Sequence, residues 1–259
     1  MCRLFGLIAN KEVDIKFSML EAVNNFKNQS QKNPHGWGIG YYKNSKPTVE
    51  KYGEQAFNSN RFDALVKEIK SKIFIAHIRF ASSGSSHSDY NAHPFIYKTW
   101  IFAHNGTINE QRIFELLKPP YNQNFTSEPI DSEIYFRYLM QCIEETRSIY
   151  KGIKVAVNEV VKDSIGANFL LTDGKKLFAF RYGNSLYYLV RNPSFLDAVS
   201  DETKALIESK SLSNEKAILI SSEKLTNTEP WRGIKNGYLL VCDNNLKYKE
   251  EKICQEICQ

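Results

Sequence analysis

The sequence predicts an α+β protein, and three features of its 259 residues lead to that prediction. Short apolar runs typical of strands recur along the chain, and turn sequences such as TDGKK and CDNNLK join several of them. Between these runs, apolar residues recur with helical spacing. No linker, repeat or shift in composition divides the chain, so we expect one domain over residues 1–259.

The expected strands are the apolar runs themselves, each bounded by polar or turn-forming residues. In chain order they are RLFGLIA (3–9), GWGIGYY (36–42), KIFIAHIRF (72–80), TWIFAHN (99–105), ANFLLT (167–172), KLFAFRY (176–182), SLYYLVR (185–191), KAILISS (216–222) and GYLLVC (237–242). The short turns between some of them favour antiparallel hairpins.

Helices are expected where apolar residues lie three or four positions apart. Such spacing occurs at Phe17, Leu20, Val23 and Phe26; at Phe62, Leu65, Val66 and Ile69; and at Ile134, Tyr138, Cys142 and Ile143. Asp131 precedes the last of these stretches and suits an N-cap. The segment KPPYNQNFTSEP at 118–129 is expected to be one long loop within the domain.

Charge and hydropathy exclude two classes of partner. The net charge of +5 comes from scattered lysines and arginines without a basic block, which indicates a solvated surface and no nucleic-acid partner. No apolar run is long enough to span a membrane, and the apolar start is interrupted by Arg3 and followed by KEVD, unlike a signal peptide. We therefore expect a cytoplasmic protein with no membrane partner.

The cysteines form no disulfide framework or metal-binding pattern. They lie at uneven spacing, and the terminal CQEIC lacks a second ligand pair; the positions are Cys2, Cys142, Cys242, Cys254 and Cys258. Cys2 follows the initiator Met1, so removal of Met1 would put a thiol and the chain's α-amine on one residue. From its position alone, Cys2 is either a nucleophile beside its base or the small apolar start of a buried strand.

Polar residues gather at the ends of three strand-like runs. HIRFASSGSSHSDYNAHPF spans residues 77–95, Asn105 and Gly106 follow another strand in FAHNGTI, and Asp131 opens a helix in IDSE. Each has a structural reading: Asn-Gly as a tight turn, Asp131 as an N-cap, and Arg79 as a surface side chain. Their occurrence together with Cys2 favours a functional site.

The order of these motifs resembles that of the type II glutamine amidotransferases, which are N-terminal-nucleophile enzymes. The matching stretches are MCRLFGLIAN, NPHGWGIGYY, HIRFASSG with NAHPF, HNGTI, IDSE, GANFLLTDGKKLFAFRYG and ISSEKL followed by Trp231. The resemblance covers nearly the whole chain and is closest to small stand-alone members. It implies a four-layer αββα sandwich of two antiparallel sheets between helical layers.

The resemblance also implies a catalytic group. Cys2 would be the nucleophile, its freed α-amine the base, and the side-chain amide of Asn105 with the backbone N–H of Gly106 the oxyanion hole. Attack on a carboxamide requires these three functions. An ordinary α-amine has a pKa of about 7.7–8.0, so part of it is neutral near pH 7. Met1 must be removed first, and the small residue at position two favours that removal.

Two further residues would recognise the ends of glutamine. Arg79 matches the arginine that binds the α-carboxylate in this family, and Asp131 matches the acid that pairs with the α-ammonium. A planar bidentate donor suits the first task. Trp37 is expected to pack in the core, and contacts from Ser82 and Ser83 to substrate stay open because relatives carry other residues there.

The histidines are expected to be structural. His77, His93 and His104 lie in or beside the motifs and are expected to hold loops by hydrogen bonds, because the family uses no catalytic histidine. A histidine base remains the competing interpretation, and roles for His35 and His87 stay open.

The resulting expectation is an enzyme that hydrolyses the side-chain amide of glutamine, or of a γ-glutamyl amide, through a γ-glutamyl thioester on Cys2. It needs no cofactor and no metal. Three alternatives stay open: a subunit that donates ammonia to a separate synthase, an amidase for other amides, and a non-catalytic glutamine-binding module. Arg79 and Asp131 together weigh against a general amidase.

Overall fold

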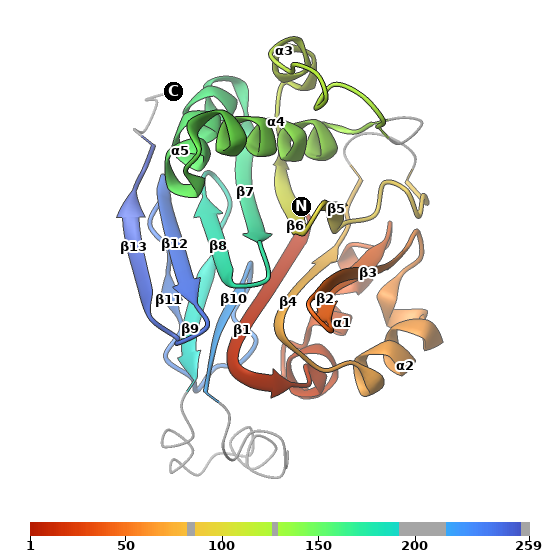
Figure 1. Cartoon of the computed structure of the whole chain (residues 1–259). Helices are drawn as coiled ribbons and strands as arrows, with labels where there is room; N and C mark the ends of the chain where they lie inside the picture. The colour runs from red at the N-terminus through yellow and green to blue at the C-terminus, as the bar shows by residue number, and fades with distance from the viewer. Residues whose placement is uncertain (82–85, 126–128, 192–215, 255–259) are drawn as a thin grey trace.

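The computed structural model describes residues 1–81, 86–125, 129–191 and 216–254, whose strands form two antiparallel sheets stacked face to face (Figure 1). The seven-stranded sheet has the order β11 (Arg232–Gly233), β9 (Tyr187–Arg191), β10 (Ala217–Ser221), β1 (Arg3–Val13), β4 (Ser71–Ile78), β2 (Trp37–Lys43) and β3 (Lys46–Tyr52). The six-stranded sheet has the order β13 (Tyr248–Lys252), β12 (Tyr238–Asp243), β8 (Lys176–Arg181), β7 (Ile165–Thr172), β6 (Trp100–Thr107) and β5 (Phe95–Tyr97).

Helices cover the outer face of each sheet. They are α1 (Phe26–Gln29), α2 (Asn60–Glu68), α3 (Glu110–Glu115), α4 (Asp131–Thr146) and α5 (Ile149–Val160), with short helical turns η1 (Phe17–Glu21), η2 (Ser30–Lys32), η3 (Ala56–Asn58) and η4 (Val161–Asp163). One apolar cluster joins α4 and α5 to the six-stranded sheet, and another joins η1, α1 and α2 to the seven-stranded sheet. The predicted αββα sandwich is confirmed.

A third apolar cluster fills the space between the sheets, and β1 shows how the strands build it. Leu4 and Ile8 belong to this inter-sheet cluster, whereas Phe5 and Leu7 belong to the cluster beneath η1, α1 and α2. Successive side chains of a strand point to opposite faces. Because both faces of the sheet are buried there, residues 4–9 of β1 form a continuous apolar run rather than an alternating one.

Every strand expected from an apolar run is present, and the two turn sequences form hairpins. In TDGKK, Asp173 Oδ1 accepts hydrogen bonds from the backbone N–H groups of Lys175 and Lys176, and in CDNNLK, Asp243 does the same for Asn245 and Lys247. The strands that the pattern did not predict are short or polar: β3, β5, β11 and β13. Each lies at or next to a sheet edge, where little apolar surface is required.

The prediction of one helix from Phe17 to Phe26 is wrong. A five-residue π-helical turn ends at Glu21, Ala22 is extended, and α1 begins anew after Asn25, whose side chain accepts from the Asn28 N–H. Asn24 donates its backbone N–H to Leu225 O, so a contact distant in sequence breaks the helix. The other two predicted helices correspond to α2 and α4, while α3 and α5 were not predicted.

Candidate active site

Cys2 lies at one end of the sandwich, one residue before β1 and next to the end of β4. The register pairs Arg3 with Ile78, so Cys2 lies beside the residues that follow Ile78 in the chain. The Cys2 thiol donates to Phe80 O over 3.4 Å, and the Phe80 N–H donates to Cys2 Sγ over 3.3 Å. The sulfur is therefore held by main-chain groups on the adjacent strand end.

A small cavity opens beside this sulfur. Its volume is about 20 Å³, and it is lined by Cys2, Arg79, Phe80, His93, His104, Gly106, Ile130, Asp131 and Ser132. The fold thus brings Cys2, Arg79, Gly106 and Asp131 together from four separate stretches of sequence. Asn105 does not line the cavity; it is buried on β6, next to Gly106.

Arg79 is buried, so its interpretation as a surface side chain is wrong. Only 2% of Arg79 is exposed, and its guanidinium donates to Ser86 O over 3.3 Å. Backbone bonds fix its position, because the Arg79 N–H donates to Gly36 O and Arg79 O accepts from the His35 N–H. Burial lowers the pKa of Arg79, and nearby Cys2 and Asp131 oppose that shift. A cation kept in such a place suits an anionic ligand.

Asp131 is the first residue of α4, and its interpretation as an N-cap is wrong. Ile130 occupies the cap position and makes no side-chain bond. The Asp131 carboxylate accepts from the Ile108 N–H over 3.2 Å and from the Ser132 hydroxyl over 3.2 Å. It therefore faces the cavity as a fixed carboxylate at the positive end of a sixteen-residue helix.

Asn105 and Gly106 lie inside β6 rather than in a tight turn, so that interpretation is also wrong. Inward residues of β6 such as Ile101 and Ala103 belong to the inter-sheet cluster, and alternation turns Asn105 to the same face. Gly106 packs so closely on Gly166 that an added Cβ would overlap the Gly166 carbonyl. The glycine is required by the contact between β6 and β7, whatever it does for a ligand.

The surroundings of Cys2 set the state of its thiol. Burial raises the pKa of Cys2, while the Phe80 N–H, the N-terminal amine and Arg79 each lower it by less. Because burial dominates, the thiol is protonated near neutral pH and needs a base before it can act as a nucleophile.

Arg3 is a site residue that sequence reasoning missed. Its Nη1 donates to Met1 O over 2.8 Å and to Cys2 O over 3.2 Å, and its Nη2 forms an ion pair with Glu223. The next strand supports the same backbone, because Ser222 Oγ accepts from the Leu4 N–H. Arg3 and the ISSEKL motif therefore fix the chain on both sides of Cys2; the acidic Glu223 within that motif was the available signal.

Two of the three motif histidines hold neighbouring groups as predicted. His77 Nε2 lies 3.1 Å from His104 O, and His104 Nδ1 lies 2.9 Å from Ser132 Oγ. His93 differs, since neither ring nitrogen has a hydrogen-bond partner among the described residues. His35 Nδ1 accepts from the Ala81 N–H, and His87 Nδ1 lies 3.1 Å from Gly53 O.

Of the remaining candidate residues, one lies in the core and the others lie outside the described residues. Trp37 is fully buried against Tyr52 and Phe62, so its prediction as a core residue is confirmed. Ser82, Ser83 and Cys258 belong to segments that the structure does not describe.

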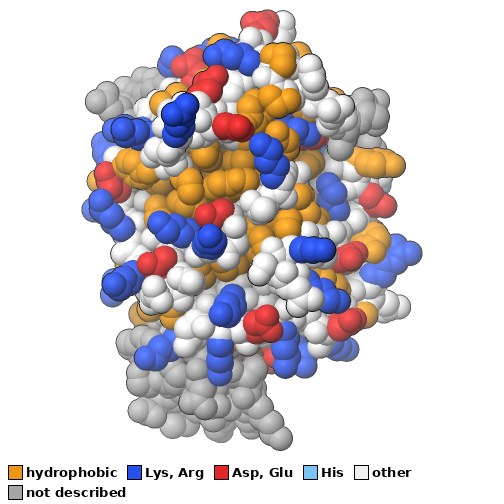
Figure 2. Space-filling view, viewed as in Figure 1, with side chains coloured by type: hydrophobic (Ala, Val, Ile, Leu, Met, Phe, Trp, Pro, Cys, Tyr) orange, Lys and Arg blue, Asp and Glu red, His pale blue; other side chains and the backbone are white. Residues whose placement is uncertain are grey.

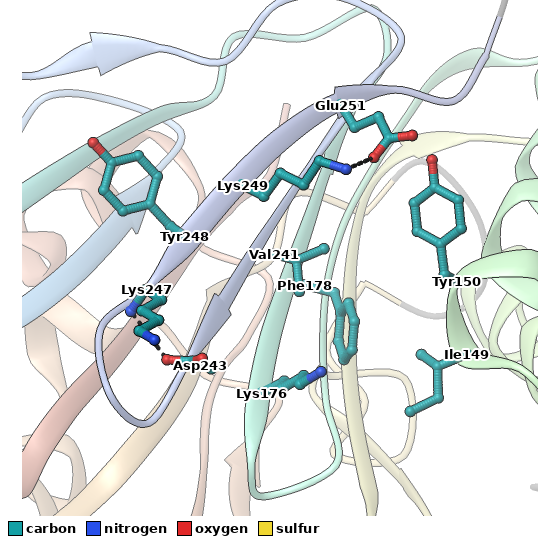
Figure 3. A pocket seen from close by; sticks show the side chains of 10 residues that line it. All are labelled: Ile149, Tyr150, Lys176, Phe178, Val241, Asp243, Lys247, Tyr248, Lys249 and Glu251. Carbon is teal, nitrogen blue, oxygen red and sulfur yellow. Dashed lines mark hydrogen bonds and ion pairs between the residues drawn. The ribbon is translucent and has the colours of Figure 1, made fainter.

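Larger hollows exist away from Cys2. Figure 2 shows apolar side chains gathered across one face and ringed by lysines and arginines. On the outer face of the six-stranded sheet, a groove of about 530 Å³ has an apolar floor of Ile149, Phe178 and Val241 (Figure 3). It contains none of the predicted site residues. In the part of the chain that the structure describes, no three or more His, Cys, Asp or Glu side chains cluster as a metal site would require, and no helix is long and apolar enough to cross a membrane.

Comparison with known families identifies the group to which this arrangement belongs. The model of the class II glutamine amidotransferases matches residues 1–255. The chain belongs to that family. A relative from Methanocaldococcus jannaschii, described as uncharacterised, is 33% identical over 265 residues and covers 94% of this chain and 70% of its own. YafJ of Escherichia coli, assigned provisionally as a glutamine amidotransferase, is 29% identical and covers 93% of this amidotransferase and 98% of its own chain.

Solved structures show the same fold for this amidotransferase. A predicted glutamine amidotransferase from Pseudomonas aeruginosa superposes with a TM-score of 0.61 at 21% identity, over 94% of this chain and 98% of that one. The glutamine phosphoribosylpyrophosphate amidotransferase of B. subtilis gives a TM-score of 0.67 at 16% identity, over 99% of this chain and 50% of its own. At these identities the likeness concerns the fold alone.

Proposed function

We propose that this protein hydrolyses the side-chain amide of glutamine, or of a γ-glutamyl amide, through a γ-glutamyl thioester on Cys2. The observation that carries the proposal is the shared cavity of Cys2, Arg79, Gly106 and Asp131. It holds a thiol, a cation and an anion, which are the groups that a free amino acid with a side-chain amide requires. Family membership supports the same reaction.

In the proposed first step, the Cys2 sulfur attacks the carboxamide carbon and the thiol proton is transferred to a base. The base passes that proton to the amide nitrogen as the carbon–nitrogen bond breaks, so the nitrogen leaves as ammonia or an amine and a thioester remains on Cys2. Water attacks that thioester in the second step, which releases glutamate and restores the thiol. The raised pKa of Cys2 is the reason that a base is needed.

The proposed base is the α-amine of Cys2 after Met1 has been removed. It lies on the same residue as the sulfur, and one water molecule can bridge them. Met1 is 71% exposed, so it is accessible to an aminopeptidase. Arg3 would keep the Cys2 carbonyl in place once Met1 is gone, because its bond to Cys2 O does not depend on Met1.

The proposed oxyanion hole consists of the Asn105 amide and the Gly106 N–H. Asn105 faces the inter-sheet layer, and its backbone carbonyl is held by the Asn184 side-chain amide over 3.1 Å. For the far end of the substrate, Arg79 binds the α-carboxylate and Asp131 the α-ammonium. The fixed carboxylate of Asp131 and the buried guanidinium of Arg79 suit these tasks.

The test is ammonia release from L-glutamine by protein whose intact mass shows that Met1 has been removed. Cys2→Ala should abolish turnover and leave the melting temperature nearly unchanged. A glutamine analogue with an electrophile at its side-chain end should label Cys2 alone. Undiminished hydrolysis by Cys2→Ala would refute the mechanism.

Two controls separate this mechanism from its competitors. Cys142 is buried in α4, where burial raises its pKa to about 11, so Cys142→Ala should retain full activity. Protein that retains Met1 behind an N-terminal tag should be nearly inactive, because an amide nitrogen is no base. Full activity of the tagged protein would instead assign the base to a histidine.

A further inference from the structure

His93 is a buried imidazole without a hydrogen-bond partner. Only 3% of the residue is exposed, and neither Nδ1 nor Nε2 bonds to any described protein group. Burial lowers its pKa well below the usual 6.5, so the ring is neutral and carries one N–H donor and one acceptor. A buried polar group without a hydrogen-bond partner lowers the stability of the fold. Such a ring in a binding cavity is a candidate ligand contact.

The position of this ring is fixed from several sides. It packs in a tilted arrangement on His77 with ring centroids 4.1 Å apart, and it makes an edge-to-face contact with Phe95 at a centroid distance of 4.8 Å. The preceding segment is anchored by Lys51, whose ammonium donates to Tyr90 O over 2.8 Å and to Ala92 O over 2.7 Å. His93 is therefore pre-organised toward the Cys2 cavity that it lines.

Within that cavity, His93 lies within electrostatic range of His77, His104, Lys51 and Arg79. His77 and Arg79 are alternate residues at the end of β4 and are expected to point to the same face, so the His93 ring, which packs on His77, lies over the face to which Arg79 belongs. The backbone agrees: a Cβ added at Gly36 would lie 3.4 Å from Ala92 Cβ and 3.7 Å from Arg79 Cβ. By contrast, the histidine coupled to Asp131 is His104.

We propose that His93 is a substrate-binding residue that donates its ring N–H to the α-carboxylate of glutamine beside Arg79. The inference rests on the proposed function and adds a second donor for the carboxylate. Arg79 supplies the charge, and His93 supplies a fixed direction for one further hydrogen bond. A hydrogen bond to a charged group is worth about 1.5–3 kcal/mol, which corresponds to about 10- to 150-fold in affinity.

The experiment compares two substrates in wild type and His93→Phe. The first is L-glutamine, and the second is 4-aminobutanamide, which is glutamine without its α-carboxylate. For glutamine, His93→Phe should raise KM about 10- to 150-fold and change kcat by less than about threefold. For 4-aminobutanamide, kcat/KM should be the same in both proteins within about twofold.

Stability and rescue distinguish binding from a structural role. His93→Phe replaces an unpaired polar ring by an apolar ring of similar shape, so its melting temperature should equal or exceed that of wild type. His93→Asn and His93→Gln place an amide N–H near the Nδ1 or the Nε2 position, and one of them should restore KM to within about fivefold. The control His87→Phe removes an exposed histidine outside the cavity and should change neither parameter.

An unchanged KM for glutamine in His93→Phe, or equal losses on both substrates, would overturn the inference. If wild type releases no ammonia from glutamine, the proposed function has failed instead. In that case, binding of L-glutamate to Cys2→Ala, with and without His93→Phe, still tests His93. Equal dissociation constants in the two proteins would refute its role.

Discussion

The two walls of the Cys2 cavity differ in how their polar side chains are held. On the α4 wall, defined by His104, Asp131 and Ser132, each side chain makes at least one hydrogen bond to another protein group, in the case of His104 through Nδ1. On the β4 wall, defined by Arg79, Phe80 and His93, the Arg79 guanidinium donates to Ser86 O and the Phe80 backbone bonds to the Cys2 sulfur, whereas the His93 ring has no partner among the described residues.

This difference indicates that the walls contribute differently to stability and binding. A side chain that satisfies its own protein's hydrogen bonds stabilises the fold, so substitutions on the α4 wall should lower stability and activity together. A buried polar group without a partner lowers stability, so substitution of His93 on the β4 wall should change binding more than stability. Variants of the two walls, and of the groups between them, therefore test this contrast.

Asn105→Ala, on the strand between the walls, should give the largest effect on turnover. If the amide stabilises the oxyanion, kcat should fall about 10²- to 10³-fold, while KM for glutamine stays within about twofold. Steady-state kinetics of ammonia release measure both values. A change confined to KM would place Asn105 in substrate recognition, together with the walls.

Acid should destabilise the protein through the buried His77, which bonds to the backbone carbonyl of His104 and packs against the ring of His93. His77 has a pKa of about 3, lowered chiefly by burial, whereas the unfolded chain has about 6.5. Between these values the unfolded state binds more protons, so the free energy of unfolding falls as pH decreases from about 6.5 toward 3. At pH 4.5, His77 alone accounts for about 2–3 kcal/mol.

Urea unfolding at pH 7 and pH 4.5 measures this loss of stability. His77→Gln should make the difference between the two pH values smaller by about 2–3 kcal/mol, and the exposed His87→Gln should leave it unchanged. The same pH dependence in His77→Gln and wild type would show that His77 is protonated in the folded protein.

Asp131→Asn, on the α4 wall, should lower both activity and stability. The neutral amide can still accept from the Ile108 N–H but no longer pairs with an ammonium. The lost interaction is worth about 1.5–3 kcal/mol, so kcat/KM for glutamine should fall about 10- to 150-fold. Losing charge-assisted bonds should also lower stability by about 1 kcal/mol. Kinetics and thermal unfolding of one preparation measure the pair, and an effect on stability alone would make Asp131 structural.

Arg79→Lys, on the β4 wall, should weaken substrate binding without changing stability, and its effect should be the smallest of these variants. Lysine keeps the charge but cannot form a bidentate pair with a carboxylate, so KM should rise about tenfold. We expect a melting temperature within about 2 °C of wild type. A large drop in melting temperature without a KM change would show that the Ser86 contact, rather than substrate, determines the residue at this position.

The sandwich could be predicted from the sequence because its inner strands are buried on both faces. β1, β4, β7 and β10 each contain an apolar run that would be unfavourable in an exposed loop, so the local sequence pattern alone predicts these strands. The edge strand β3 carries only partly buried or exposed residues, and its KPTVEKY sequence therefore gave no signal. The break between η1 and α1 also escaped prediction, because it depends on a backbone bond to Leu225.

For the site, the order of the motifs was enough to predict which residues take part. The burial and the hydrogen-bond partners of those residues depend on packing between segments that are distant in sequence. The motifs named Cys2, Arg79, Gly106 and Asp131, but local patterns assigned Arg79 to the surface and Asp131 to a cap. Only the packing of α4 on β6 turned the Asp131 carboxylate toward the cavity, and only the close approach of the His93 backbone to Gly38 brought His93 into the lining of the same cavity. Burial and hydrogen-bond pairing arise between segments distant in sequence, and these are the quantities that separate a ligand contact from a structural polar residue.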